Sequence, residues 1–427
     1  MIKKFFILIF LFITFFIFNY YFNFSLKTKY IVAGTGNPGK IYVYETKDEI
    51  LNKIKTLNTG YKFVHTVKIG DIYNNGGKQI VAGVSNSFFA EPYGCKVVSY
   101  DVKDFKESIV DDVGDLRCKD LTIGDADNDG KDEIILATHG RGIVRIYKWI
   151  DGRWNKEDLE DNYISKIDAQ EKTNHRVDNK DLPCKECVVQ TAVHIVKVGD
   201  VDNDGKNELI TTMSSPLELQ KIDEISYIRL YKKVDGKWQN KTIDQISNRE
   251  FRSITIGDIH NQKKNVLLVG IGSPRNEKGS LYVYEYFNGK WGKRIIYNDQ
   301  DEKNMKGVAL GDINGAGKQT ILLATGFPNA KIMTLESEAK GFKKKLIGTI
   351  ASLFKLDKPE FNSMVALISQ ANKNTNLIIG GTTIYPDKKI GWEGADQGYL
   401  VVYSKKGNIW IPKIIETKNI LGMDMEK

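Results

Sequence analysis

The stretch IGDADNDGKDEIILAT, residues 123–138, contains the unit from which the rest of the chain is built. An apolar strand ends in Gly-Asp, a polar loop follows, and a second apolar strand begins. The same order recurs in IGDIYNNGGKQIVAG from Ile69, VGDVDNDGKNELITT from Val198, IGDIHNQKKNVLLVG from Ile256 and LGDINGAGKQTILLAT from Leu310. Repeats of roughly 50 residues that each hold several short strands are typical of β-propellers, whose sheets bury their faces only against one another.

The aspartate after each Gly serves as an anchor for counting the units. Clear anchors are Asp71, Asp125, Asp200, Asp258 and Asp312, with weaker copies at Ser369 and Asp424. The wide interval before Asp200 contains a polar insertion at residues 157–190. We therefore predict an all-β fold, a seven-bladed β-propeller of four-stranded antiparallel blades.

The two ends of the repeat region complement each other. Residues 31–57 supply the second, third and fourth strands of a unit, and residues 418–424 supply a first strand alone. Pairing of these N- and C-terminal strands would close the ring and hide two sheet edges that otherwise favour aggregation. A linear array of sheets is the alternative.

Residues 1–29 differ from the propeller domain predicted for residues 30–427. Lys3 and Lys4 precede an apolar, aromatic-rich run from Phe5 to Phe24, close to the roughly 20 residues that span a bilayer. This pattern predicts a signal anchor retained as a transmembrane helix, with a cleaved signal peptide or a buried core helix as alternatives. The propeller would then be membrane-anchored outside the cytoplasm, or secreted.

The charge and cysteine content restrict the partners and the compartment. The 62 Lys and Arg exceed the 54 Asp and Glu, for a net charge of +8 over 427 residues. Part of this excess lies in the first 29 residues, so we expect no nucleic-acid partner. Four cysteines predict two disulfides in an oxidising compartment, with three pairings open. A redox pair or half of a zinc site at Cys184 and Cys187 is the alternative.

Two of the loops are rich in acids. The loop that begins at Asp125 carries acids at Asp125, Asp127, Asp129 and Glu133. The loop that begins at Asp200 repeats this spacing with Asp200, Asp202, Asp204 and Glu208. Such clustered carboxylates repel one another unless a cation lies among them, and Ca²⁺ accepts about six to eight oxygen ligands. We predict Ca²⁺ in both loops, with solvated turns as the alternative. The other five loops have too few carboxylates and are expected to form neutral hydrogen-bonded turns.

These units resemble the FG-GAP or VCBS repeats of integrin α-subunit propellers and their bacterial relatives. The resemblance rests on the Asp-rich loop between the first and second strands, and it covers nearly all of the chain after the leader. It implies that both acid-rich loops bind structural calcium on the face of the disc opposite the ligand surface. Propellers of this type include lectins, calcium-dependent rhamnogalacturonan lyases and adhesion proteins, so the fold does not select a function.

A basic residue recurs six positions before the anchors. The position holds His65, Lys119, His194, Arg252, Lys306 and Lys418, and Ser363 in the remaining unit. Apolar residues two and four positions before almost every anchor mark the strand interior. The basic residue is therefore expected where the first strand starts, near the central axis and across the disc from the calcium loops. Positive groups around one axis favour an anionic ligand, and ordinary surface exposure in a Lys-rich chain is the alternative.

Three functions fit these features. The first is a membrane-tethered, calcium-stabilised propeller that acts as a binding module for a carbohydrate or protein partner. The second is a polysaccharide lyase for acidic glycans, whose base and charge-neutralising groups would come from His65, His194, Lys119 and Arg252. The third is an envelope scaffold. Neither a metalloprotease, a nucleophile-elbow, a Walker nor a dinucleotide motif occurs in the sequence, so enzymatic activity is left open.

Overall fold

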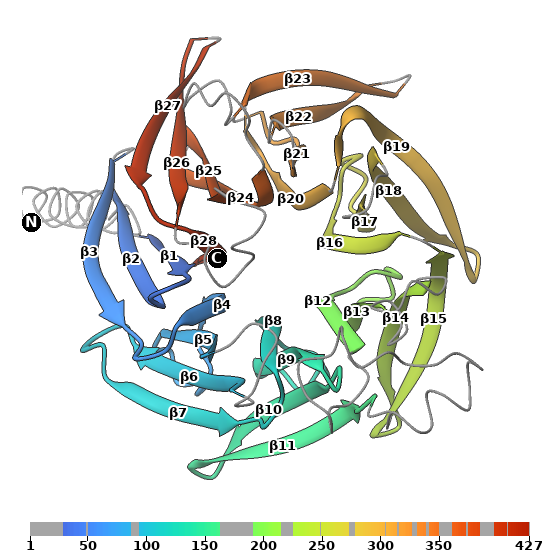
Figure 1. Ribbon diagram of the computed structural model, residues 1–427. Helices are drawn as coiled ribbons and strands as arrows, with labels where there is room; N and C mark the ends of the chain where they lie inside the picture. The colour runs from blue at the N-terminus through green and yellow to red at the C-terminus, as the bar shows by residue number, and fades with distance from the viewer. Residues whose placement is uncertain are drawn as a thin grey trace, which may run out of the picture.

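Strands arranged as a ring of sheets around a central axis make up the structure, a computed structural model (Figure 1). It describes residues 29–47, 50–86, 94–162, 191–214, 225–247, 249–272, 278–303, 305–313, 316–326, 331–338, 341–349, 361–372, 375–384, 397–407 and 409–426. Within these ranges every regular element is a β-strand. The prediction of an all-β propeller is therefore confirmed at the level of the fold.

Hydrogen bonding groups the described strands into five four-stranded sheets and one eight-stranded sheet, antiparallel throughout. Given from the inner strand outwards, the four-stranded sheets are β28 (Ile420–Met425), β1 (Lys29–Thr35), β2 (Lys40–Lys47) and β3 (Ile50–Asn58); β4 (Phe63–Gly70), β5 (Gln79–Ser85), β6 (Lys96–Asp101) and β7 (Glu107–Asp112); β16 (Glu250–Gly257), β17 (Val266–Gly272), β18 (Lys278–Phe287) and β19 (Lys290–Lys303); β20 (Met305–Gly311), β21 (Thr320–Thr325), β22 (Lys331–Glu338) and β23 (Gly341–Thr349); β24 (Phe361–Asn372), β25 (Thr375–Ile384), β26 (Gln397–Lys406) and β27 (Ile409–Glu416).

The eight-stranded sheet joins two repeats. One half contains β8 (Arg117–Gly124), β9 (Glu133–Gly140), β10 (Val144–Ile150) and β11 (Arg153–Glu160), and the other contains β12 (Thr191–Gly199), β13 (Glu208–Ser214), β14 (Ile225–Val234) and β15 (Lys237–Ser247). The halves meet where β9 pairs with β12, with Gly140 opposite Thr191 and His139 opposite Ala192.

The prediction of seven separate four-stranded blades is thus wrong, because these two repeats form one continuous sheet. The physical reason lies at the strand ends. Relative to their anchors, β9 ends one residue later than β5, and β12 begins one residue earlier than β4. The extra residues bring the two ends within hydrogen-bonding range of each other.

The N- and C-terminal strands pair and close the ring, as the sequence predicts. Strand β28 pairs with β1 from Ile31 opposite Met425 to Gly34 opposite Gly422. The inner strands also contact one another in sequence around the axis, in the order β4, β8, β12, β16, β20, β24 and β28, and β28 contacts β4. A linear array of sheets is therefore excluded.

The predicted transmembrane helix requires a correction. Among the described residues, no helix is long and apolar enough to cross a membrane. The apolar run from Phe5 to Phe24, on which that prediction rested, lies outside the described residues. The membrane partner and the membrane-anchored location are therefore not retained.

Close contact between neighbouring sheets explains the Gly of the Gly-Asp motif. A Cβ atom on Gly257 would lie 2.6 Å from Cδ1 of Leu310 on the next inner strand, and one on Gly124 would lie 3.3 Å from Cβ of Val198. The second strands are buried along their whole length, as in β5 and β9, because each sheet packs against a neighbour on both faces. Only glycine allows the backbones to approach this closely at the axis.

Tyrosines of the third strands connect adjacent sheets at the outer side. The hydroxyl of Tyr147 donates to Asp111 of the preceding sheet (2.8 Å), and that of Tyr284 donates to Asp244 (2.7 Å). Tyr44 donates in the same way to Glu416 (2.9 Å) across the point where the ring closes. Each buried ring thus adds a directed hydrogen bond to apolar burial.

A disulfide links two neighbouring sheets. Cys95, directly before β6, is bonded to Cys118 in β8. This is one of the pairings that the sequence left open, and Cys184 and Cys187 lie outside the described residues.

The sheet contacts predict the effect of a small overpacking mutation. A Cβ atom on Gly270 would lie 2.2 Å from the carbonyl oxygen of Met305 in the next sheet, so we expect Gly270→Ala to lower the free energy of unfolding by about 1–3 kcal/mol. The control is Gly292→Ala, whose Cβ would meet nothing closer than 3.7 Å. Equal urea midpoints for the two variants would contradict the proposed packing.

Candidate functional site

The anchor aspartates shape their loops through backbone hydrogen bonds. Asp125 accepts from the backbone N–H groups of Asp129 (3.0 Å) and Gly130 (3.0 Å), and Asp71 accepts from those of Asn75 (3.1 Å) and Gly76 (2.6 Å). Asp200 and Asp312 make the equivalent pairs of bonds. The anchor aspartate therefore holds the same hydrogen-bonded turn in acid-rich and acid-poor loops.

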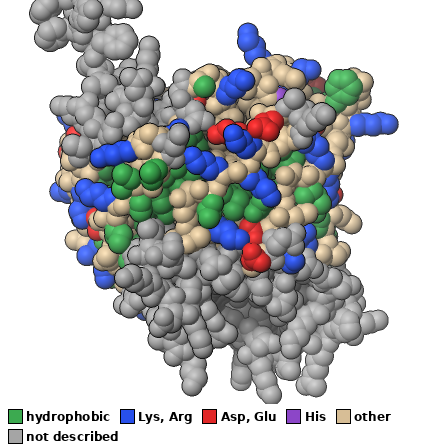
Figure 2. Space-filling model, turned by 90° about the horizontal axis from the view of Figure 1, so that it is seen from above, with side chains coloured by type: hydrophobic (Ala, Val, Ile, Leu, Met, Phe, Trp, Pro, Cys, Tyr) green, Lys and Arg blue, Asp and Glu red, His purple; other side chains and the backbone are tan. Residues whose placement is uncertain are grey.

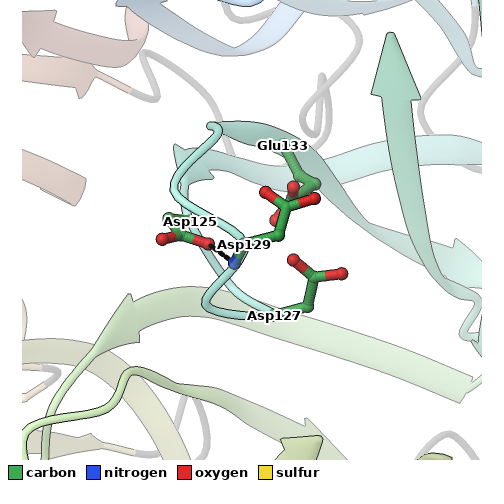
Figure 3. A group of neighbouring side chains, drawn as sticks. All are labelled: Asp125, Asp127, Asp129 and Glu133. Atoms are coloured by element: carbon green, nitrogen blue, oxygen red, sulfur yellow. Dashed lines mark hydrogen bonds between the residues drawn. The ribbon is translucent and has the colours of Figure 1, made fainter. Parts of the chain in front are cut away.

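The acid-rich loops gather most of the predicted metal ligands. Oxygens of Asp125, Asp127, Asp129 and Glu133 lie within 4.8 Å of one another (Figure 3). Oxygens of Asp200, Asp202 and Glu208 also lie within 4.8 Å of one another. Asp204 is outside the second group and forms an ion pair with Lys232. The structure thus assembles two acidic groups that could hold a metal ion.

A buried glutamate completes each group from the start of the second strand. Glu133 and Glu208 are 1% and 0% exposed, and each accepts a hydrogen bond from a loop backbone N–H, that of Ala126 (2.9 Å) and that of Val201 (3.0 Å). Burial first, and then the charges of Asp127 and Asp129, raise the pKa of Glu133 to about 7. Burial likewise raises the pKa of Glu208. Both groups therefore favour a neighbouring cation.

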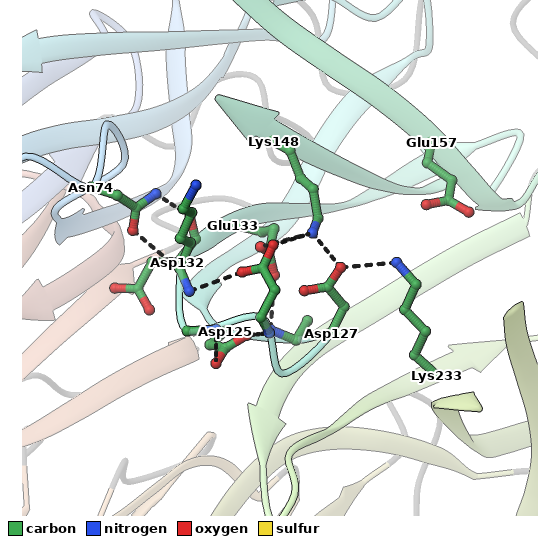
Figure 4. A network of polar contacts seen from close by, with 12 residues as sticks. Asn74, Asp125, Asp127, Asp132, Glu133, Lys148, Glu157 and Lys233 are labelled. Carbon is green, nitrogen blue, oxygen red and sulfur yellow. Dashed lines mark hydrogen bonds and ion pairs between the residues drawn. The ribbon is translucent and has the colours of Figure 1, made fainter. Parts of the chain in front are cut away.

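Lysines that the sequence analysis missed already lie in these groups. Nζ of Lys148, on β10, contacts Asp127, Asp129 (2.9 Å) and Glu133 (3.5 Å), and Nζ of Lys233, on β14, lies 2.9 Å from Asp127 (Figure 4). Nζ of Lys232 lies 3.1 Å from both Asp202 and Glu208. Burial alone would lower the pKa of Lys148, but its hydrogen bonds to Asp127 and Asp129 raise that pKa overall.

Asparagines connect each loop to the next around the disc. Asn74 donates to the carbonyl of Asp132 (3.1 Å) and accepts from its N–H (2.7 Å), as Figure 4 shows. Asn128 makes the same two bonds to Asn207, and Asn203 makes them to Asn265. The three donors stand three residues after their anchors with positive φ angles of 53°, 62° and 62°. These residues position the acid-rich loops relative to their neighbours.

The predicted basic residues converge at the other end of the inner strands. His65 lies on β4, Lys119 on β8, His194 on β12, Arg252 on β16 and Lys306 on β20. Together with Arg117 of β8 and His139 of β9 we call them the axial cluster. Lys418 is exposed and lies between β27 and β28, two residues before the inner strand β28 begins, and the prediction made for it stays a prediction. The side chain of Ser363 lies outside the described set.

Electrostatic coupling shows that these groups influence one another. Burial lowers the pKa of His194 well below its ordinary value, and Arg252, Lys119, His139 and Arg117 lower it further. Burial also lowers the pKa of Lys306, with further contributions from Arg252 and Arg117. His65 is shifted in the same direction, by burial first and then by Arg117 and Lys119. Basic side chains from different inner strands therefore lie close enough at the axis to interact electrostatically.

Polar partners of the axial cluster repeat from unit to unit. Nε2 of His65 lies 2.7 Å from Oγ of Ser85, and Nε2 of His194 lies 2.8 Å from Oγ of Ser214. His139 occupies the position of these serines in its own unit and hydrogen-bonds Arg117. Glu250 forms an ion pair with Arg252 and lies 4.0 Å from His194. A search for polar residues fourteen positions after each anchor would have found Ser85, His139 and Ser214.

Comparison with known proteins supports the fold and does not identify a family. No family model matches the chain, and no curated protein matches its sequence. The FG-GAP/VCBS membership predicted from the loops is thus not shown.

Solved structures similar to this one are propellers of low sequence identity. A protein from Lactobacillus plantarum aligns with a TM-score of 0.55 and 10% identity over 94% of this chain and 100% of that chain. A periplasmic gluconolactonase from Pseudomonas aeruginosa aligns with a TM-score of 0.52 and 11% identity over 94% and 99%. A putative 6-phosphogluconolactonase from Bacteroides fragilis aligns with a TM-score of 0.51 and 11% identity over 94% of this chain and 98% of that chain. These likenesses establish the propeller fold alone.

The depressed histidine pKa values predict acid sensitivity. Because the folded-state pKa values of His65 and His194 lie below those of the unfolded chain, the unfolded state binds more protons below about pH 6.5, and stability falls as pH falls through that range. We expect His65→Asn with His194→Asn to lose less unfolding free energy than the unmodified chain between about pH 7 and about pH 5. His260→Asn, outside the axial cluster, is the control. Parallel stability curves for all three proteins would refute this account.

Proposed function

We propose that this protein is a calcium-stabilised propeller that binds an anionic ligand, either an acidic carbohydrate or a partner protein, at the axial cluster. The observation that carries the proposal is the convergence of basic residues from five inner strands within electrostatic reach of one another. Buried like charges cost stability, and such arrangements are concentrated at functional sites. A multiply charged anion would offset their mutual repulsion.

The distribution of charge elsewhere supports this choice of surface. Lys and Arg side chains are also scattered over the rim between apolar ones (Figure 2). On β23, for example, Lys343 is exposed to solvent, where its charge is screened. The axial groups are less exposed and surrounded by protein, so their field is screened less. An anion therefore gains more at the axis than at the rim.

The acid-rich loops support a stabilising role for calcium. They offer four and three carboxylates at mutual distances suited to one cation, and they resemble FG-GAP or VCBS loops in spacing. The loops follow the ends of β8 and β12, whereas Lys119 and His194 lie toward the starts of those strands. Calcium would thus stabilise the disc from the face opposite the ligand. The disulfide fits a protein that folds in an oxidising compartment.

A second candidate function is elimination on an acidic glycan. His194 has a depressed pKa, so it is neutral near pH 7 and able to accept a proton, and Arg252 and Lys119 influence it electrostatically. A lyase needs a base beside groups that neutralise a uronate. Incubation with oligogalacturonides, followed by the absorbance of unsaturated products, tests this candidate. If the protein binds oligogalacturonides but forms no unsaturated product, the binding module is favoured over the lyase.

Charge reversal at the axis is expected to weaken anion binding. We expect Lys119→Glu with Arg252→Glu to weaken binding of acidic oligosaccharides at least about tenfold in calorimetry, because attractive charges become repulsive. The matched control, Lys343→Glu with Lys413→Glu, makes the same charge change on exposed outer strands. Equal losses in both variants would point to general charge rather than to the axial cluster.

Calcium is expected to raise thermal stability through the acid-rich loops. At about 100 times the Kd, each occupied site would add about 2.7 kcal/mol to the unfolding free energy. EDTA should therefore lower the Tm of the unmodified protein, and Asp127→Ala with Asp202→Ala should lower the Tm and remove its response to EDTA. Asp132→Ala, in the first loop but outside its acidic group, should keep the response. An unmodified protein indifferent to EDTA would argue against bound calcium.

A further inference from the structure

Each of the two units with an acid-rich loop has a lysine at a position where the other units have none. The residue that follows the tyrosine of the third strand is Lys148 in β10 and Lys232 in β14. At the same position the other units carry Glu45, Asp101, Glu285, Glu336 and Ser404. A lysine therefore stands there in the two units whose loops are rich in acids and in none of the others.

The register of the sheets explains this association. Tyr147 lies opposite Ile134, so Lys148 is placed beside Glu133 at the edge of the loop. Lys232 is placed beside Glu208 in the same way. In the unit that begins with β4, glutamine replaces the glutamate and aspartate replaces the lysine, and Gln79 donates to Asp101 (3.4 Å). The lysine and the glutamate thus form a cross-strand pair of opposite charges in both units.

The ammonium group of each lysine lies where a metal ion would bind. Nζ of Lys148 contacts three of the four carboxylates in the first acidic group, and Nζ of Lys232 contacts two of the three in the second. A cation coordinated by those oxygens would overlap with the ammonium group. Oδ1 of Asp127 accepts no hydrogen bond from the described residues although its side chain is only 4% exposed. This oxygen is available to a further cation.

We propose that Lys148 and Lys232 are tethered counter-ions of the two loops, and that calcium enters each loop only in exchange for the ammonium group. This inference rests on the calcium binding proposed above and specifies its mechanism. Without metal, the lysine neutralises part of the acidic group and the loop keeps its turn. With metal, the flexible lysine stem lets the ammonium group move into solvent. The exchange costs binding free energy, so the lysines set the calcium affinity.

Chemical labelling of lysines tests the exchange in the unmodified protein. With a water-soluble acylating reagent and mass spectrometry, Lys148 and Lys232 should be labelled faster when calcium is added than when EDTA is added. Lys131 and Lys206 are exposed lysines of the same two loops, and their labelling should stay constant. Calcium binding is measured on the same sample by calorimetry.

Substitution provides a second readout. Lys148→Met and Lys232→Met keep an unbranched side chain of similar length without the charge. Each is expected to lower the Kd for calcium at its loop at least about tenfold, because a positive charge a few Å from the ion is removed. The matched controls Lys131→Met and Lys206→Met remove the same charge from the same loops at exposed positions, and their effect should be small.

The outcomes separate this inference from the calcium proposal itself. Faster labelling with calcium, or tighter binding in Lys148→Met than in Lys131→Met, supports the exchange. Calcium binding with unchanged labelling and equal Kd values overturns the exchange and leaves calcium binding in place. Binding by the methionine variants alone supports the lysines as occupants and contradicts calcium in the unmodified protein. Absence of binding in every protein overturns both.

Discussion

Contact between neighbouring sheets is the interaction on which this structure depends, because a single sheet here has two apolar faces and no other means to cover them. Three kinds of contact recur at several of the junctions. Glycine lets the inner strands approach at the axis, asparagine joins consecutive loops on one face, and tyrosine binds the acid of the preceding sheet at the outer side. The candidate sites are built from the same junctions, so their geometry is fixed by packing rather than by mobile loops.

The two charged sites occupy opposite ends of the same strands. On β8, Arg117 and Lys119 lie at the start, and the acid-rich loop follows Gly124 at the end. Each end collects like charges that a partner of opposite sign would stabilise. At the acidic end the chain supplies part of that partner itself through Lys148 and Lys233. At the axial end Glu250 is the described carboxylate that pairs with Arg252.

Much of this architecture could be predicted from repetition alone. The anchors, the four strands of each unit and the pairing of the terminal strands follow from the spacing of Gly-Asp and from the missing first strand. The fusion of two repeats could not be predicted, since it depends on one extra residue at the ends of β9 and β12. The motif placed the acids correctly along the loops, but Lys148 and Lys232 approach them across the sheet, which only the register reveals.

The hydrogen bond between Tyr30 and Glu426 joins residues 396 positions apart at the point where the ring closes. During synthesis from the N-terminal end, strands β1 to β3 therefore leave the ribosome without their inner strand and present an open sheet edge. They keep that edge until residues 420–425 have been made. The ring can be completed only after β28 has been translated, and in the meantime the nascent edge is open to pairing with other polypeptides.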